Sequence, residues 1–291
     1  MELTLTGYST ARFSTWYFIE ELGLLFDAGD GLISSLLSKS RKINHVFISH
    51  ADRDHLTGLL QFNQLNARPG YPIIYYPKDA GSFPRLEEFS KKFDPHVTGT
   101  VWTPITEHTE EIRIRKDLLI QPVRNGHVQA AENISKSLSY KLIQTKEKLK
   151  PEFLHLPGEE IRKIVMERGK ESTTVEVRTN ILSYSGDTPV EDAQRWDHSL
   201  ILIHEATFLG GDEEVHAHGN KHSTLEEVME MVSGIHIEKL VLGHFSSRYS
   251  KEQIDSSIRT LCDKYAINIP VFRVLPGEAM FDILNGQPVN K

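Results

Sequence analysis

His50-Ala51-Asp52-Arg53-Asp54-His55 is the most informative segment of this chain for its fold. It places four potential metal ligands, two imidazoles and two carboxylates, in six consecutive positions. Alternate side chains of an extended loop point the same way, so His50 and Asp52 can converge on one ion. Asp54 and His55 can then turn toward a neighbouring ion. Because transition metals accept both kinds of ligand, the spacing indicates a two-ion site.

The segments on either side of this loop are typical of regular structure. The apolar run His45-Val46-Phe47-Ile48 predicts a buried strand, and residues 56–65 predict a helix. Loops at such junctions often carry functional sites on a rigid scaffold. The alternative is a polar surface loop that happens to contain two histidines. Its position directly after a buried strand favours the metal site.

The same pattern recurs along the chain, because several predicted strands run directly into polar, chemically active residues. These strands are residues 24–26, 118–123, 180–184, 199–203 and 239–242, and they run into Asp27, His127, Asp187, His204-Glu205 and His244. Helices are predicted at 32–37, 223–232 and 253–265. Strands and helices alternate without a Gly/Ser linker. The sequence therefore predicts one α/β domain with helices outside sheets.

The loop resembles the HxHxDH motif of the metallo-β-lactamase superfamily. Five further segments, in the same chain order, narrow the resemblance to the ribonuclease Z-like branch. They are an Asp-Gly-rich turn at 26–31, Ser-Gly-Asp-Thr at 185–188, His-Glu-Ala-Thr-Phe at 204–208, His-Ser-Thr at 222–224 and the last ligand motif at 242–249. Each motif is weak to moderate alone, and the common order makes the match specific. The resemblance implies an αββα sandwich, with one domain over residues 1–291.

The resemblance also implies a ligand set. The first ion would be held by His50, Asp52 and His127, the second by Asp54, His55 and His244, with Asp187 as the bridge between them. Zinc is the expected metal, with manganese or iron as alternatives. About four ligands for each ion leave positions open, as a catalytic site requires. Two divalent ions lower the pKa of a water and neutralise charge on a phosphoryl or carbonyl oxygen.

Four residues receive catalytic roles from the resemblance. Asp54 would orient the attacking water or take its proton, and His222 would protonate the leaving oxygen. Glu205 would set the tautomer of His222, and Arg248 would pair with a substrate phosphate or an acidic side chain. His222 could instead be a helix N-terminal residue without a catalytic role, and Arg248 could form a structural ion pair. The nearby His216-Ala217-His218 is predicted to be a polar loop rather than a metal clip.

The chain departs from the family in two places. Asp52 stands where the family usually has a second histidine, and its carboxylate is a harder ligand that suits manganese or iron as well as zinc. Asp52 could also fail to bind metal, which would leave the first site weak. Residues 141–178 lie where the family has a basic arm that grips tRNA. They carry nine basic and seven acidic side chains and are predicted to be mostly helical between 157 and 170. The arm therefore looks reduced, and tRNA binding is in doubt.

Composition sets limits on the function. The chain has 291 residues and a net charge of −7, and no polybasic run indicates sequence-independent nucleic-acid binding. The single cysteine, Cys262, cannot form an internal disulfide, which fits a reducing compartment. The N-terminal residues lack the features of a signal peptide, and no apolar run approaches the ~20 residues of a membrane helix. We therefore expect a cytoplasmic protein without a membrane partner.

These features predict a metal-dependent hydrolase that cleaves phosphodiester bonds, acting on RNA or on a small-molecule phosphodiester. One alternative is a small-molecule hydrolase on the same fold, with a cyclic nucleotide, lactone or thioester as substrate. Another is a non-catalytic metal-binding sensor, since Asp52 changes the first site. The family resemblance also implies a homodimer.

Overall fold

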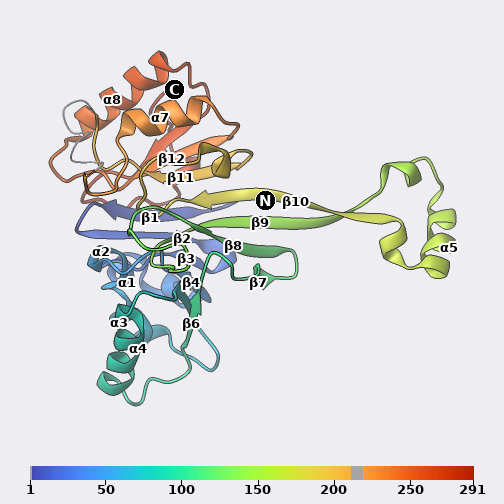
Figure 1. Cartoon of the computed structure of the whole chain (residues 1–291), viewed down its shortest axis with the longest axis horizontal. Helices are drawn as coiled ribbons and strands as arrows, with labels where there is room; N and C mark the ends of the chain where they lie inside the picture. Colours follow the sequence, from blue (N-terminus) through green and yellow to red (C-terminus); the bar gives the residue numbers. More distant parts are fainter. Residues whose placement is uncertain (1, 211–218) are drawn as a thin grey trace.

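The structure is a computed structural model that describes residues 2–210 and 219–291, and it contains two sheets (Figure 1). The first sheet has the order β1-β2-β3-β4-β5-β6. Its strands are β1 (Leu5–Thr10), β2 (Ser14–Ile19), β3 (Leu24–Phe26), β4 (His45–Phe47), β5 (Ile73–Pro77) and β6 (Val101–Ile105). The second has the order β13-β12-β11-β10-β9-β8-β7. Its strands are β7 (Ile112–Arg115), β8 (Leu118–Arg124), β9 (Leu138–Leu149), β10 (Thr174–Tyr184), β11 (Ile201–Glu205), β12 (Lys239–Gly243) and β13 (Val271–Arg273).

Helices cover the outer face of each sheet, and the molecule is layered α-β-β-α (Figure 1). The helices of the first half are α1 (Leu32–Leu36), α2 (Arg53–Leu56), α3 (Leu59–Asn66) and α4 (Ser82–Phe93). Those of the second half are α7 (Leu225–Ser233) and α8 (Lys251–Lys264). Each half changes from antiparallel to parallel pairing across its sheet, at β3 and at β10. The αββα sandwich predicted from the sequence is confirmed.

The two sheets are held together by an aromatic core. Phe26 and Phe47 from the first sheet pack against Tyr140 and Tyr184 from the second, with ring centroids 5.1 to 6.0 Å apart. These separations are typical of favourable offset or tilted aromatic pairs. Two further apolar clusters lie one on each sheet, between that sheet and its own helices. The inner core therefore fixes how the ends of the two sheets face each other.

The helix predicted at 56–65 is in fact two helices, α2 and α3, separated at Gly58. A Cβ atom at Gly58 would lie 2.2 Å from the carbonyl oxygen of Gly29, so only glycine allows this close approach. The Gly58 amide donates to the Ala28 carbonyl, and the Ala28 amide donates to the His55 carbonyl. The break therefore ties the loop at residues 50–55 to the turn that follows β3.

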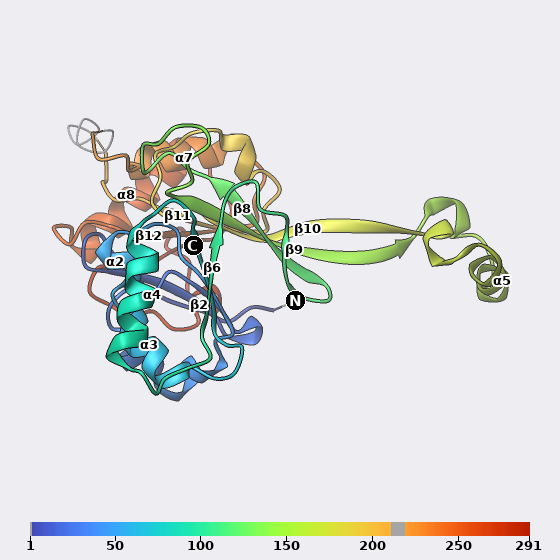
Figure 2. The same ribbon diagram turned by 60° about the horizontal axis from the view of Figure 1, so that its bottom comes forward.

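An arm extends far from the body, formed by β9, β10 and the helix α5 (Gly158–Arg168) at its tip (Figures 1 and 2). The helix agrees with the prediction, whereas the flanks are long antiparallel strands paired from Thr174↔Leu149 to Tyr184↔Tyr140. These long strands were not predicted from the sequence, and the reduced character of the arm relative to the family stays a prediction. Val175-Glu176-Val177-Arg178-Thr179 alternates β-branched and charged side chains, which is the period of a strand. The charged side chains of both signs in this segment obscured the strand pattern in the sequence.

Within residues 2–210 and 219–291, no helix is long and apolar enough to cross a bilayer.

Candidate metal centre

The polar residues gather at one edge of the sandwich because the strands that precede them end there. Asp27 follows β3 and His50 follows β4 in the first sheet, and His127 follows β8 in the second. Asp187 follows β10, Glu205 ends β11 and His244 follows β12. In α/β proteins the carboxyl ends of strands are the usual place for ligands. The pattern of strands running into polar residues therefore builds one site.

Asp187 lies at the centre of this cluster. Its Oδ2 atom is 3.2 Å from Nε2 of His55, 3.2 Å from Nε2 of His244 and 3.7 Å from Nε2 of His50. The side chain is almost fully buried. One carboxylate therefore faces both predicted ion positions, as a bridging ligand must.

The donors predicted for the first ion come together on one side of Asp187. The rings of His50 and His127 are 4.5 Å apart, and both histidines have donor atoms within 4.8 Å of Asp187. Asp52 faces the same position, since its Oδ2 is 3.6 Å from Nε2 of His50 and 3.7 Å from Nε2 of His127. Unlike the other donors, Asp52 is largely exposed, with 62% of its side chain accessible.

The donors predicted for the second ion lie on the other side of Asp187. Oδ2 of Asp54 is 3.6 Å from Nε2 of His55 and 3.4 Å from Nε2 of His244. The main-chain amide of Arg12, in the β1–β2 turn, donates to the same Asp54 oxygen at 2.9 Å. That bond holds the carboxylate against the two imidazoles.

The chemistry of the donors fits divalent metal ions. Nε2 of His50 and Nε2 of His55 are buried, and neither has a hydrogen-bond partner among the described residues. Buried polar atoms without partners are costly unless an unseen group satisfies them. Both atoms point at the Asp187 carboxylate, where a cation between nitrogen and oxygen donors would satisfy them. The set of imidazoles and carboxylates suits zinc, iron or manganese.

The remaining nitrogens of the histidines are held by a second set of bonds. Nδ1 of His55 pairs with Oδ2 of Asp27 at 2.7 Å, and Nδ1 of His50 pairs with the Ser49 hydroxyl at 2.9 Å. Nδ1 of His127 contacts the Lys221 carbonyl at 3.0 Å. Such partners fix the tautomer and leave Nε2 free to bind metal.

Glu205, Thr207 and His222 form a connected group beside the centre. Nδ1 of His222 is 2.9 Å from Oε1 of Glu205, while the Thr207 hydroxyl donates to Oε2 of Glu205 at 2.5 Å. The Thr207 oxygen is also 2.9 Å from Nδ1 of His244. Burial opposes a charge on His222, but the Glu205 carboxylate outweighs it and raises the pKa of His222 to about 9. Thr207 thus links the proposed acid pair to a proposed metal ligand.

The electrostatics of the centre follow from opposite charges in a buried space. Burial alone would raise the pKa of Asp187, but His244 and His55 outweigh it and hold that pKa well below its usual range. Burial is likewise outweighed at Asp54, where the hydrogen bond with His244 lowers the pKa to about 2. The carboxylates Asp187 and Asp27 raise the pKa of His55 against the effect of burial. The carboxylates are therefore ionised at neutral pH, as metal binding requires.

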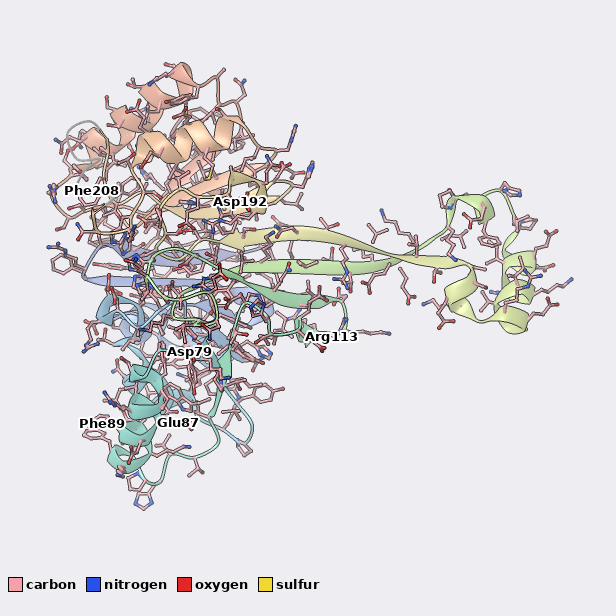
Figure 3. All side chains as sticks on the ribbon, viewed as in Figure 1. Asp79, Glu87, Phe89, Arg113, Asp192 and Phe208 are labelled. Carbon is pink, nitrogen blue, oxygen red and sulfur yellow. The ribbon has the colours of Figure 1, made fainter. Side chains whose placement is uncertain are left out.

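A cavity of about 470 Å³ opens over the centre. Its wall includes Arg12, Gln129, Phe208 and Lys221 together with five of the predicted ligands, Asp52, Asp54, His127, Asp187 and His244. Phe208 lies on the side of the body away from the arm (Figure 3). The Arg248 guanidinium carbon lies farther out, 5.6 Å from the centre of the Phe208 ring. The structure thus brings the predicted metal ligands, His222 and Glu205 together and places Arg248 outside them.

Some functional residues were not identified from the sequence. The sequence places Asp27 after a predicted strand, as it does His244, but assigns it no contact with a predicted metal ligand. Thr207 lies within a motif that gives it no role, and the backbone contacts of Arg12 and Lys221 have no signature in their side chains. His216 and His218 lie outside the described residues.

Comparisons with known proteins identify the class of this fold and site. The family model described as "Beta-lactamase superfamily domain" matches residues 24–245, and the chain belongs to this family. A solved metallo-β-lactamase fold protein, YhfI from Bacillus subtilis, has a TM-score of 0.65 at 14% identity, covering 96% of this chain and 100% of its own. The short form of human tRNase Z has a TM-score of 0.58 at 19% identity, covering 84% and 93%.

Curated relatives narrow the resemblance. A chloroplastic tRNase Z of Arabidopsis thaliana is 28% identical over 286 residues, which is 91% of this chain and 73% of that protein. The ribonuclease Z of Methanocaldococcus jannaschii is 28% identical over 256 residues, with coverage of 79% and 78%. The predicted superfamily and its ribonuclease Z-like branch are confirmed.

The Thr207 hydroxyl gives a direct test of the bonds around the centre. We expect Thr207→Val to weaken metal binding about 10-fold to 100-fold, because the ring of His244 loses its hydroxyl partner. Competition with a graded series of chelators measures the affinity. Thr207→Ser keeps the hydroxyl and should bind metal as the wild type does. Equal affinities for the valine variant and the wild type, with an unchanged circular dichroism spectrum, would show that Thr207 does not orient the ligand.

Proposed function

We propose that this chain is a metal-dependent hydrolase that cleaves phosphodiester bonds in RNA. The observation that carries the proposal is the position of Asp187, one carboxylate facing the imidazoles of His50, His55 and His244. The curated relatives named ribonuclease Z and tRNase Z support a phosphodiester in RNA as the substrate.

Two ions bound at this centre would lower the pKa of a water and neutralise charge on the phosphoryl oxygens. The residues we propose for the first ion are His50, Asp52 and His127. Those we propose for the second are Asp54, His55 and His244, with Asp187 shared. Asp54 also stands at the rim of the cavity, where its carboxylate can orient a water or accept its proton.

His222 is the proton donor in this proposal. Its Nδ1–H is directed at Glu205, which leaves Nε2–H to face a substrate. A pKa of about 9 keeps the ring protonated at neutral pH, so that it can give a proton to the leaving oxygen. Glu205 is fixed in turn by Thr207 and by the Thr188 amide. Arg248 and Lys221, near the same opening, would contact phosphates farther along the substrate.

The arm supports a large substrate rather than a small one. β10 contains eleven residues between the arm tip and Tyr184. At ~3.3 Å per residue, this strand alone is about 35 Å long. A molecule that touches both the tip and the metal centre must therefore have the dimensions of a folded RNA. The outer arm also carries Lys146, Lys148, Lys163 and Lys170, which can contact a phosphate backbone.

Hydrolysis of a structured RNA by the metal-loaded protein tests the proposed activity. We expect cleavage that stops with EDTA and returns with added zinc or manganese. His222→Gln should lower the rate constant about 10²-fold to 10⁴-fold, because the proton donor is lost, while the metal content is unchanged. Lys264→Gln, on the remote helix α8, is the matched control. Inactivity of the fully metal-loaded wild type toward both RNA and bis(p-nitrophenyl) phosphate would favour the sensor alternative.

Shortening the arm tests the size of the substrate. Replacing residues 147–176 by a two-residue Asn-Gly turn should raise KM for RNA at least tenfold and leave hydrolysis of bis(p-nitrophenyl) phosphate unchanged. The arm lies far from the centre, so only the binding of a long substrate should suffer. An equal effect on both substrates would contradict the proposed role. No effect on either would favour the small-molecule alternative.

Asp52 sets the character of the first ion site in this proposal. The first site would offer two carboxylate oxygens, from Asp52 and Asp187, and two imidazole nitrogens, from His50 and His127. This donor set suits manganese and iron as well as zinc. We expect the centre to hold about two ions in the wild type and about one in Asp52→Ala, so that the variant binds one ion fewer per chain, while Asp52→His should keep two ions there and favour zinc. Elemental analysis after reconstitution measures both number and identity, with the surface variant Asp263→Ala as control. An unchanged metal content in Asp52→Ala would exclude Asp52 as a ligand.

A further inference from the structure

A second group of metal donors lies outside the centre described above. Asp197, His198 and His236 offer ligand atoms that all lie within 4.8 Å of one another. Oδ1 of Asp197 is 3.3 Å from Nδ1 of His236, and its Oδ2 is 3.5 Å from Nε2 of His198. Each oxygen of one carboxylate therefore faces a different imidazole.

The geometry of this group fits a single transition metal ion. In a tetrahedral zinc site with bonds of ~2.0–2.1 Å, two ligand atoms are separated by about 3.3 Å. The two nitrogen–oxygen distances at Asp197 are close to that value. The rings of His198 and His236 stack at 5.4 Å with an angle of 8° between their planes. Both imidazoles are therefore next to the Asp197 carboxylate and close to each other.

The backbone holds the three residues in place. Oδ1 of Asp197 accepts the amides of His236 at 2.7 Å and of His198 at 3.0 Å. The His198 amide also lies 2.8 Å from the His236 carbonyl. His198 has a φ of 60°, in the left-handed region that non-glycine residues rarely adopt. The loops before β11 and before β12 are thus joined at these donors.

This cluster is separate from the catalytic edge. It precedes β11 and β12, whereas Glu205 and His244 stand at the opposite ends of the same parallel strands. Five residues of strand, at ~3.3 Å each, place about 16 Å between the two ends. An ion bound here would not touch the substrate cavity.

We propose that Asp197, His198 and His236 form a peripheral site for one zinc-like divalent ion. Two imidazoles and one carboxylate supply three ligands, and the exposed face of the cluster leaves the fourth position to water. This donor set selects borderline transition metals and discriminates against calcium and magnesium, which prefer oxygen donors. The ion would act as a staple between the loops that start β11 and β12. Binding to the folded state would raise thermal stability without changing the catalytic rate.

Zinc binding to the full-length protein tests the site. Protein whose catalytic centre has been loaded is dialysed against micromolar free zinc, and zinc per chain is then counted for the wild type, His198→Gln and His236→Gln. His96→Gln removes an exposed histidine that belongs to none of the described donor clusters and serves as the control. We expect the wild type and the control to bind one ion more than either cluster variant. The zinc-dependent rise in Tm should disappear with that ion, while the rate of RNA cleavage stays the same.

Cobalt(II) provides an independent measurement on the same proteins. The wild type should gain the visible absorption of a four-coordinate ion beyond that of the loaded centre, and the two cluster variants should not. Equal zinc counts and equal cobalt spectra for the wild type and both variants would overturn the proposal. So would a loss of RNA cleavage that parallels the loss of the extra ion.

Discussion

The buried carboxylate of Asp27 is the interaction on which the rest of the site depends. It accepts the amide and the hydroxyl of Ser49, pairs with Nδ1 of His55 and accepts the hydroxyl of Tyr184. Ser49 belongs to the loop after β4, and Tyr184 ends β10, so one carboxylate connects both sheets to a metal ligand. Replacing Asp27 by an apolar residue would leave several buried polar groups without hydrogen-bond partners. Each such group lowers the stability of the fold by about 1–3 kcal/mol. Asp27 adopts a left-handed φ of 54° to reach all four partners.

The fold also carries an electrostatic cost at this edge. Several carboxylates and imidazoles share a buried space, and two imidazole nitrogens there have no described partner. Paired charges that leave water lose hydration that only well-placed counter-charges restore. The charges and unpartnered nitrogens of the cluster therefore fit bound cations better than hydrogen bonds within the protein alone. The close packing of the aromatic core prevents the two sheets from separating to admit water.

The sequence predicted those features that depend on neighbouring residues. The strand at 45–48, the loop after it and the helix at 223–232 are local patterns, and the structure has β4 at His45–Phe47 and α7 at Leu225–Ser233. The division at Gly58 could not be predicted, because it depends on contact with a turn almost thirty residues earlier. The flanks of the arm and the helix α4 were missed because their side chains are mostly exposed, so burial imposes little pattern on them. The predicted metal ligands are distant in sequence. They come together because the strands that precede them end at the same edge of the sandwich.

The arm differs from the sandwich in what keeps it folded. Between residues 146 and 178 only Thr173 is buried, so the outer strands and α5 contribute almost nothing to a hydrophobic core. A two-stranded ribbon has marginal stability in water on its own. The outer arm should therefore open and close as a separate unit, with far less protection from hydrogen exchange than the sheets. Any molecule that binds the outer arm must offset the entropy lost when the arm is ordered. Part of the binding free energy is therefore spent on ordering the arm, which lowers the affinity for molecules that make few contacts with it.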